Sequence, residues 1–139
     1  MSDPFDLQRF VDAQRATYDQ ALAELRAGEK RTHWMWFVFP QIAGLARSGM
    51  AQRFAISSLD EARAYLAHPV LGPRLVECAR ALTGLDVDDP VQVMGPVDAQ
   101  KLRSSMTLFA HADPDQPVFR QVLDHYFGGA EDDATTSLL

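Results

Sequence analysis

The stretch KRTHWMWFVFPQ, from Lys30 to Gln41, contains both tryptophans of the chain, two residues apart. Two phenylalanines and a proline accompany them, and His33 and the cations Lys30 and Arg31 stand just before. Aromatic side chains of this size either fill a core or form the wall of a ligand pocket. Cations beside such a wall suit a flat, negatively charged ligand. The stretch therefore raises two alternatives, core packing and a binding site.

The conformation of this stretch decides where the tryptophans point. In a helix, Trp34 and Trp36 would diverge by about 200°, because one turn takes 3.6 residues. In an extended segment, residues two apart share a face. We expect a short helix or an irregular connection that ends at Pro40. Core packing explains Phe37 and Phe39 more easily than the tryptophans, because an indole N–H usually needs a hydrogen-bond partner.

Apolar residues recur at steps of three and four on both sides of this stretch, which predicts α-helices. The first helix is expected to begin with Asp3 as N-cap and Pro4 at the first helical position, and to close at Gly28. Ser58 followed by Glu61 has the spacing of a capping box at the start of another helix. The chain around the aromatic stretch is therefore helical.

The second half of the chain continues the same pattern. Further helices are expected over residues 70–84, 91–95, 98–112 and 117–129, with a last turn capped by Asp132 or Asp133. No segment alternates like a strand between hairpin turns. The sequence thus predicts an all-α fold: a compact multihelical single domain over residues 1–139, with six or seven helices.

Composition narrows the classes of function. The chain has 139 residues, 13 Lys and Arg against 19 Asp and Glu, and a net charge of −6. An acidic protein is not expected to bind nucleic acid or anionic membrane through its overall charge. One cysteine, Cys78, excludes an internal disulfide, and the N-terminal sequence does not have the pattern of a signal peptide. We expect a soluble cytoplasmic protein; a homo-oligomer is compatible with the sequence but not indicated by it.

A second unusual stretch is KLRSSMTLF, from Lys101 to Phe109. Lys101 and Ser105 are four residues apart and therefore neighbours on one helix face. Such a pair is either an activated nucleophile or an ordinary solvated face. Ser104 and Ser105 are poor helix formers, and their hydroxyls either bond back to the helix or reach a ligand.

Metal and phosphate-loop motifs are missing from the sequence. None of the four histidines has a Cys or His partner at metal-ligand spacing, so we expect no metal and no cofactor. His33 is the one weak candidate for acid–base chemistry, because it lies inside the aromatic stretch. The segment with Gly44 and Gly49 matches no phosphate-binding pattern, and its Ser48 is expected to cap the next helix.

Five motifs occur in order along the chain: RFVDAQ (residues 9–14), HWMWFVFPQ (33–41), GLARS (44–48), AYLAHPVLGPRL (64–75) and KLRSSMTLF (101–109). Together they resemble the bacterial family catalogued as domain of unknown function 1810. The resemblance covers nearly the whole chain and implies a mainly α-helical domain. It implies no established activity, catalytic residue or cofactor.

The two unusual stretches lead to a functional hypothesis: a site for a flat anionic small molecule, resembling a nucleotide, between the HWMWFVFPQ segment and the KLRSS helix. The alternatives are a protein–protein interaction module without catalysis and a hydrolase of a nucleotide-derived substrate. The candidate ligand-binding residues are Lys30, Arg31, His33, Trp34, Trp36, Gln41, Lys101, Ser104 and Ser105.

Overall fold

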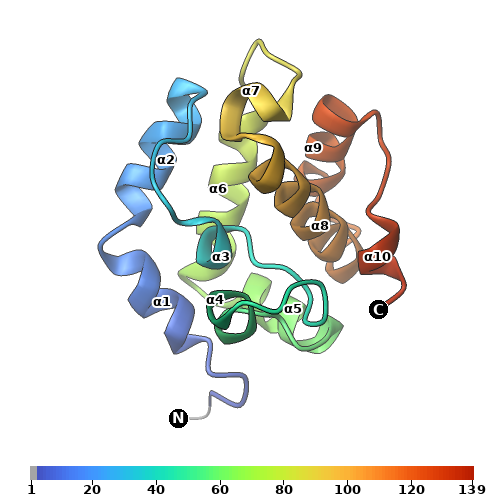
Figure 1. Ribbon diagram of the computed structural model, residues 1–139. Helices are drawn as coiled ribbons and strands as arrows, with labels where there is room; N and C mark the ends of the chain where they lie inside the picture. Colours follow the sequence, from blue (N-terminus) through green and yellow to red (C-terminus); the bar gives the residue numbers. More distant parts are fainter. Residues whose placement is uncertain (1–2) are drawn as a thin grey trace.

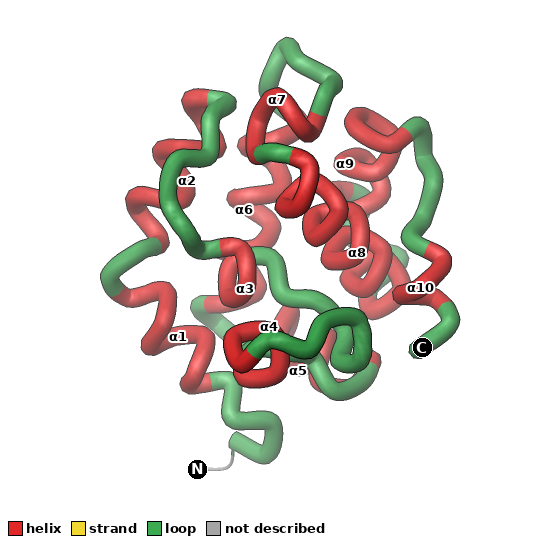
Figure 2. The backbone as a smooth tube through the Cα atoms, viewed as in Figure 1, coloured by secondary structure: helices red, strands yellow, loops and turns green. Residues whose placement is uncertain are grey.

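The computed structural model describes residues 3–139, and in this range it has ten helices and no strand (Figures 1 and 2). The prediction of an all-α fold is confirmed. Six helices have eight or more residues, which agrees with the expected six or seven, and the other four are single turns. Their bounds are α1 (Gln8–Arg15), α2 (Tyr18–Ala27), α3 (Met35–Val38), α4 (Gly49–Arg53), α5 (Leu59–Ala67), α6 (Leu71–Thr83), α7 (Pro90–Met94), α8 (Pro96–Ala112), α9 (Val118–Phe127) and α10 (Asp133–Thr136).

Four of the longer helices enclose the core. Helix α6 packs against α5 and α9, and α8 packs against the same two helices, so the four form a closed ring. Aromatic rings bridge it: the centroids of Tyr65 and Phe109 lie 5.4 Å apart, and those of Phe109 and Phe119 lie 5.8 Å apart. All three side chains are fully buried, which makes them major contributors to the hydrophobic stabilisation of the ring.

The N-terminal helix differs from the expected one. The structure has two helices, α1 and α2, separated by Ala16 and Thr17, because the halves pack against different partners, α3 and α6. The expected start at Pro4 was also wrong, since the helix begins at Gln8. The N-cap residue is Leu7 rather than Asp3, but the carboxylate of Asp3 accepts hydrogen bonds from the amides of Leu7 and Gln8 at this end of the helix. The expected end at Gly28 is confirmed, with a φ of 73°.

The aromatic stretch forms one helical turn, α3, and then an irregular connection, as expected. Its position is set by α1, where the side-chain amide of Gln14 donates to the carbonyl of Phe37 at 2.7 Å. The chain then leaves in a loop that is closed at its base. There the amide of Ile56 donates to the carbonyl of Gln41, and the amide of Ala43 donates to the carbonyl of Ile56, both at 2.8 Å.

Three expected helix caps are confirmed. The hydroxyls of Ser48 and Ser58 accept hydrogen bonds from backbone amides at the starts of α4 and α5. Asp132 caps α10. The side chain of Glu61 bonds to the amide of Ser57 rather than to that of Ser58, so the reciprocal half of the capping box is shifted by one residue. No helix within residues 3–139 is long and apolar enough to cross a membrane.

Candidate functional site

The segment before α3 is held by one buried carboxylate, that of Glu24 on α2. Its oxygens accept hydrogen bonds from the indole of Trp34 at 3.0 Å and from the backbone amides of Arg31 and Thr32 at 2.8 and 3.0 Å. They also accept from the hydroxyl of Thr32 at 2.6 Å and from the amide of Gln20 at 2.8 Å. Five donors on one carboxylate fix the path of the chain into α3.

These contacts determine the protonation state of Glu24. Burial by itself raises the pKa of this carboxyl, because it disfavours the charged form. The hydrogen bonds from Thr32, Arg31 and Gln20 outweigh burial and lower the pKa well below its ordinary value of 4.5. Glu24 is therefore ionised throughout the neutral range.

The two tryptophans occupy different environments. Trp34 is 1% exposed, and its ring lies 6.2 Å from that of Phe39, so both of its faces are within the protein. Trp36 is only partly buried and packs at the edge of the core. Of the two indoles expected at the site, Trp36 is therefore the one that a ligand can reach.

Both lysines of the chain contact a single carboxylate, that of Asp98 near the start of α8. The ammonium of Lys30 lies 2.8 Å from one oxygen, and that of Lys101 lies 3.4 Å from the other. Each ammonium also lies against a tryptophan: Lys30 at 5.0 Å from the ring of Trp34, and Lys101 at 3.6 Å from that of Trp36. Both tryptophans and both lysines thus form one cluster around Asp98.

A surface groove begins at Lys101. One wall is the loop after α3, the other is α8, and the segment leading into α10 closes the end; the volume is about 420 Å³. Its lining residues are Gln41, Leu45, Ala46, Val97, Gln100, Lys101, Ser104, Asp132 and Ala134. In Figure 1 this region lies where the loop before α4 faces α8 and α10.

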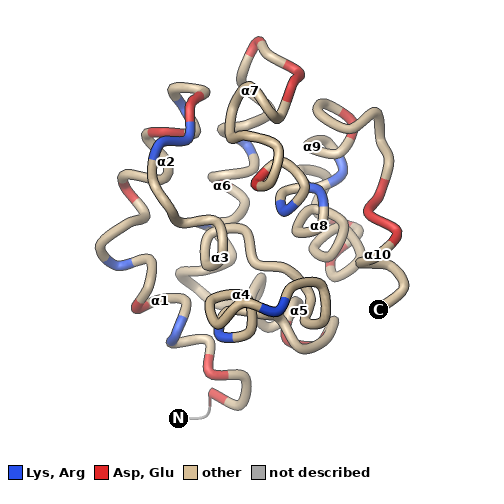
Figure 3. Tube along the Cα trace, in the orientation of Figure 1, with Lys and Arg blue, Asp and Glu red and all other residues tan. Residues whose placement is uncertain are grey.

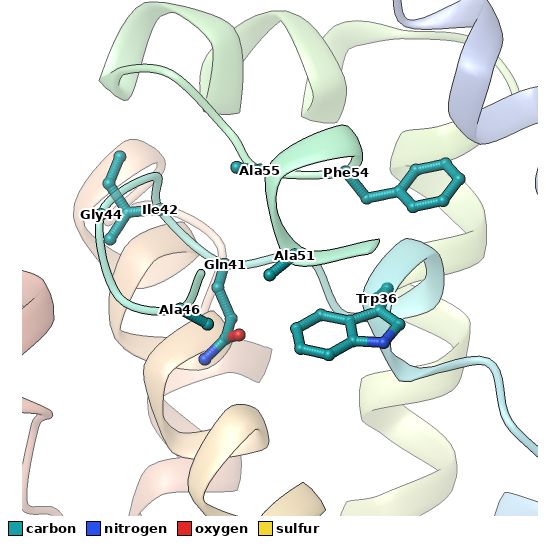
Figure 4. A pocket seen from close by; sticks show the side chains of 8 residues that line it. All are labelled: Trp36, Gln41, Ile42, Gly44, Ala46, Ala51, Phe54 and Ala55. Atoms are coloured by element: carbon teal, nitrogen blue, oxygen red, sulfur yellow. The ribbon is translucent and has the colours of Figure 1, made fainter. Parts of the chain in front are cut away.

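A small hollow adjoins the groove and shares Gln41 and Ala46 with it. It has room for about one water molecule, with a volume of about 10 Å³. In Figure 4 the side chains of Gln41 and Trp36 lie on opposite sides of this hollow, next to Ala51. Trp36 therefore lines the hollow rather than the groove itself, and its link to the groove is the contact of its ring with the ammonium of Lys101.

Asp132 also lines the groove, beside Gln100 and Ser104 of α8. Its carboxylate accepts hydrogen bonds from Ser104 at 2.9 Å, Gln100 at 3.1 Å, and the amide and hydroxyl of Thr135 at 3.2 and 2.6 Å. Burial raises the pKa of Asp132, but the bonds from Thr135 and Ser104 outweigh it and lower the pKa below its ordinary value. This group is a charged structural anchor between α8 and α10.

The structure brings only some of the predicted residues together. Trp36, Gln41, Lys101 and Ser104 meet at the groove or its adjoining hollow. Lys30 and Trp34 are buried next to these residues and do not line the groove. The side chain of Lys30 is 6% exposed, and Trp34 is 1% exposed.

The remaining three predicted residues lie elsewhere. Arg31 is exposed and pairs with Glu29. His33 is exposed and makes no side-chain hydrogen bond to any of residues 3–139. Ser105 is fully buried, and its hydroxyl has no hydrogen-bond partner among those residues.

Sequence reasoning missed the acidic members of the site. Asp98 precedes Lys101 by three residues, a helical spacing at which an ion pair is expected, so a signal for it existed. Asp132 was expected only as a helix cap. Glu24 gave no signal as a site residue, because its partners in the segment before α3 are seven to ten residues away across a loop of irregular conformation.

This arrangement favours binding over proton transfer. The carboxylates of Asp98 and Asp132 are both engaged, by lysines in the first case and by hydrogen-bond donors in the second. Within residues 3–139, no cluster of three or more His, Cys, Asp or Glu side chains could hold a metal ion. What the groove offers a ligand is one partly exposed ammonium, an amide and a hydroxyl, and the indole of Trp36 lines the small hollow beside it.

Comparison with known proteins places the chain in a family. A solved structure of the conserved hypothetical protein Rv1873 from Mycobacterium tuberculosis is 52% identical in sequence, with a TM-score of 0.97, over 99% of this chain and 98% of that one. No functionally curated protein matched. The profile of the family described as "Protein of unknown function (DUF1810)" matches residues 4–139. The chain therefore belongs to the DUF1810 family.

Proposed function

We propose that the groove between the Gln41 loop and α8 binds a small molecule that combines a flat ring with an anionic group, such as a nucleotide or a nucleotide-derived compound. In this proposal Lys101 neutralises the anionic group and Trp36 contacts the ring. Gln41 and Ser104 orient the ligand by hydrogen bonds, and Lys30 and Trp34 support the cluster from behind.

The observation that carries the proposal is the fixed position of the Lys101 ammonium. It is held 3.6 Å from the centroid of the Trp36 ring and 3.4 Å from Asp98, yet its side chain still lines the groove and is 18% exposed. A lysine side chain normally loses much rotamer freedom when it binds a ligand. The rotamer freedom of Lys101 is already restricted by these contacts. A ligand can therefore pair with its ammonium at a lower cost in side-chain entropy.

The neighbouring polar groups add directional contacts. The backbone of Gln41 is fixed by Ile56, but its side-chain amide has no hydrogen-bond partner among residues 3–139. The single hydroxyl proton of Ser104 is shared between Asp132 at 2.9 Å and the carbonyl of Gln100 at 3.1 Å, and the residue is 2% exposed, so Ser104 can offer a ligand only an acceptor lone pair at the floor of the groove. The groove volume, about 420 Å³, is within the range of roughly 300–1,000 Å³ that is usual for small-molecule sites.

Tryptophan fluorescence combined with thermal shift provides the test. A nucleotide and metabolite collection is screened for compounds that raise the melting temperature; a compound at a hundredfold excess over its Kd adds about 2.7 kcal/mol to the stability. Any hit is titrated against wild type and Trp36→Phe, which keeps Trp34 and its bond to Glu24. The fluorescence change should be much smaller in Trp36→Phe than in wild type.

Lys101→Met tests whether the positive charge of Lys101 is needed for binding. Arg15→Met is the control, because Arg15 is a cation on α1, away from the groove, with a side chain that is 70% exposed. Lys101→Met should remove most of the shift in melting temperature, whereas Arg15→Met should leave it intact. Equal binding by wild type and Lys101→Met would refute the assignment of this groove.

A second candidate function, a protein-interaction module, is favoured by apolar side chains beside the groove. Val97 is 67% exposed in the groove wall, and Leu138, 47% exposed, lies next to Gly44, one residue from Leu45. If this face mediates self-association, sedimentation at high protein concentration should show a dimer that Val97→Asp disrupts and Val91→Asp, on α7, does not. A monomer at all concentrations would remove the support for self-association.

A further inference from the structure

The charges that line or adjoin the groove nearly cancel. Lys30 and Lys101 contribute two positive charges, and Asp98 and Asp132 contribute two negative charges. Arg47, next to the lining residue Ala46, is exposed and forms no ion pair with any of residues 3–139. Figure 3 shows the same mixture, with acidic and basic residues close together near the start of α8 and acidic residues before α10. Such a groove does not have the accumulated positive charge that a polyphosphate requires.

The charge is nevertheless distributed unevenly along the groove. Asp98 is closer to Lys30, at 2.8 Å, than to Lys101, at 3.4 Å, and Lys30 is almost fully buried. Lys101 is therefore the less neutralised of the two cations and the one in contact with the groove. At Lys101 the groove carries one incompletely balanced positive charge, which can pair with one anionic group.

A carboxylate in the lining repels a second anionic group. Asp132 lines the groove beside Gln100 and Ser104, the α8 residues on either side of Lys101 in the sequence, and its oxygens accept from both of them and from Thr135. A ligand whose anionic group pairs with Lys101 therefore has the rest of its surface near a fixed carboxylate. Neutral groups that donate hydrogen bonds are tolerated beside Asp132, whereas a second phosphate is disfavoured by like-charge repulsion.

We infer that the ligand of this groove is a ring compound with a single negative charge, such as a cyclic nucleotide or an aromatic monocarboxylate, and not a nucleoside di- or triphosphate. This inference rests on the proposed function and specifies its ligand class. The shared chemistry is one flat ring, one delocalised negative charge and hydrogen-bonding edges. The volume of about 420 Å³ is sufficient for one such ring compound.

A charge series tests the inference. Adenosine, cyclic AMP, AMP and ATP have one base in common and increase in negative charge, and nicotinate represents the aromatic monocarboxylates. Calorimetry at about 150 mM salt measures each affinity, because exposed charges beyond roughly 8 Å are then screened. Cyclic AMP should bind at least roughly tenfold tighter than adenosine, because it has the same nucleoside and gains one charge-assisted contact. ATP should bind severalfold more weakly than cyclic AMP.

An added positive charge should change this order. Val97 lines the groove and is 67% exposed, so Val97→Lys adds a cation there without disturbing the core. Val91→Lys makes the same change at a residue 47% exposed on α7 that does not line the groove. The ratio of ATP affinity to cyclic AMP affinity should rise severalfold in Val97→Lys and stay within about twofold of wild type in Val91→Lys.

The outcomes separate the two proposals. Tightest binding of ATP or AMP by wild type, or equal binding of adenosine and cyclic AMP, would overturn the single-charge inference and leave the groove as a ligand site. If Val97→Lys and Val91→Lys change the ratio of ATP affinity to cyclic AMP affinity equally, charges that line the groove do not set the ligand preference. If nicotinate binds and cyclic AMP does not, the inference is supported with an aromatic monocarboxylate as the ligand type. No binding by any of the five compounds would overturn the proposed function and the inference together.

Discussion

The indole N–H of Trp34 donates to Oε1 of Glu24 at 3.0 Å, ten residues earlier in the chain. This one bond links α2 to the aromatic stretch and accounts for a tryptophan that is 1% exposed. The same carboxylate holds the backbone amides of Arg31 and Thr32. The approach to α3, and with it the position of Trp36, therefore depends on a buried acidic residue that lies outside the groove.

Glu24→Gln should lower the free energy of unfolding by about 3 kcal/mol, because a buried amide cannot accept from all of the donors that the carboxylate satisfies. Urea denaturation followed by circular dichroism measures the change. Glu29→Gln is the matched control: Glu29 is 61% exposed and pairs only with Arg31, so its replacement should cost less than about 1 kcal/mol. Similar losses in the two variants would contradict the anchoring role of Glu24.

The stability should also depend on pH through Glu24 and Asp132. Both folded-state pKa values lie below the ordinary values of 4.5 and 3.8, so the unfolded state binds more protons in this range. Their contribution is therefore fully present above about pH 5 and is lost as the pH falls through the unfolded and then the folded values. Urea denaturation from pH 7 to pH 3 should show this loss. The slope should be smaller in Glu24→Gln, and an unchanged slope would exclude Glu24 as its source.

The adjacent serines of α8 should respond oppositely to replacement by alanine. Ser104→Ala removes a donor to Asp132 and should cost about 1–2 kcal/mol. Ser105→Ala removes a buried hydroxyl that has no partner among residues 3–139, and should be neutral or stabilising by up to about 1 kcal/mol. Thermal melts of the two variants make the comparison. A large loss of stability in Ser105→Ala would mean that its hydroxyl has a structural role.

Gly72 allows α5 and α6 to approach closely at their junction. A Cβ at this position would lie 2.0 Å from the carbonyl oxygen of Leu66, a clash that only a backbone shift relieves. Gly72→Ala should therefore destabilise the protein by about 3 kcal/mol, at the upper end of overpacking costs. Gly49→Ala is the control, since nothing lies within 4 Å of its added Cβ, and it should be neutral or slightly stabilising. Equal melting temperatures in the two variants would contradict the packing at this junction.

Local chemistry was enough to predict the helical class and most helix ends. Ser48, Ser58, Asp132 and Gly28 cap helices as expected, because a side-chain oxygen near free amides, or a glycine at positive φ, acts within one turn of the chain. Local sequence chemistry did not predict the helix break at Ala16 and Thr17. There no breaker residue is present, and the helix divides because α1 packs on α3 while α2 packs on α6.

For the candidate site, too, the sequence predicted some features and tertiary contacts decided the others. Residue type and spacing alone identified the aromatic stretch and the KLRSS segment as unusual. In the structure Gln41, Lys101 and Ser104 line one groove, and Trp36 lines the small hollow beside it. The sequence could not indicate that Trp34 is the buried tryptophan and Trp36 the partly exposed one beside Lys101, because that choice depends on the bond from Trp34 to Glu24. Nor could it indicate that Asp98 joins Lys30 to Lys101. These contacts bring together residues from separate helices, and their energies depend on distance and burial that exist only once the chain has folded.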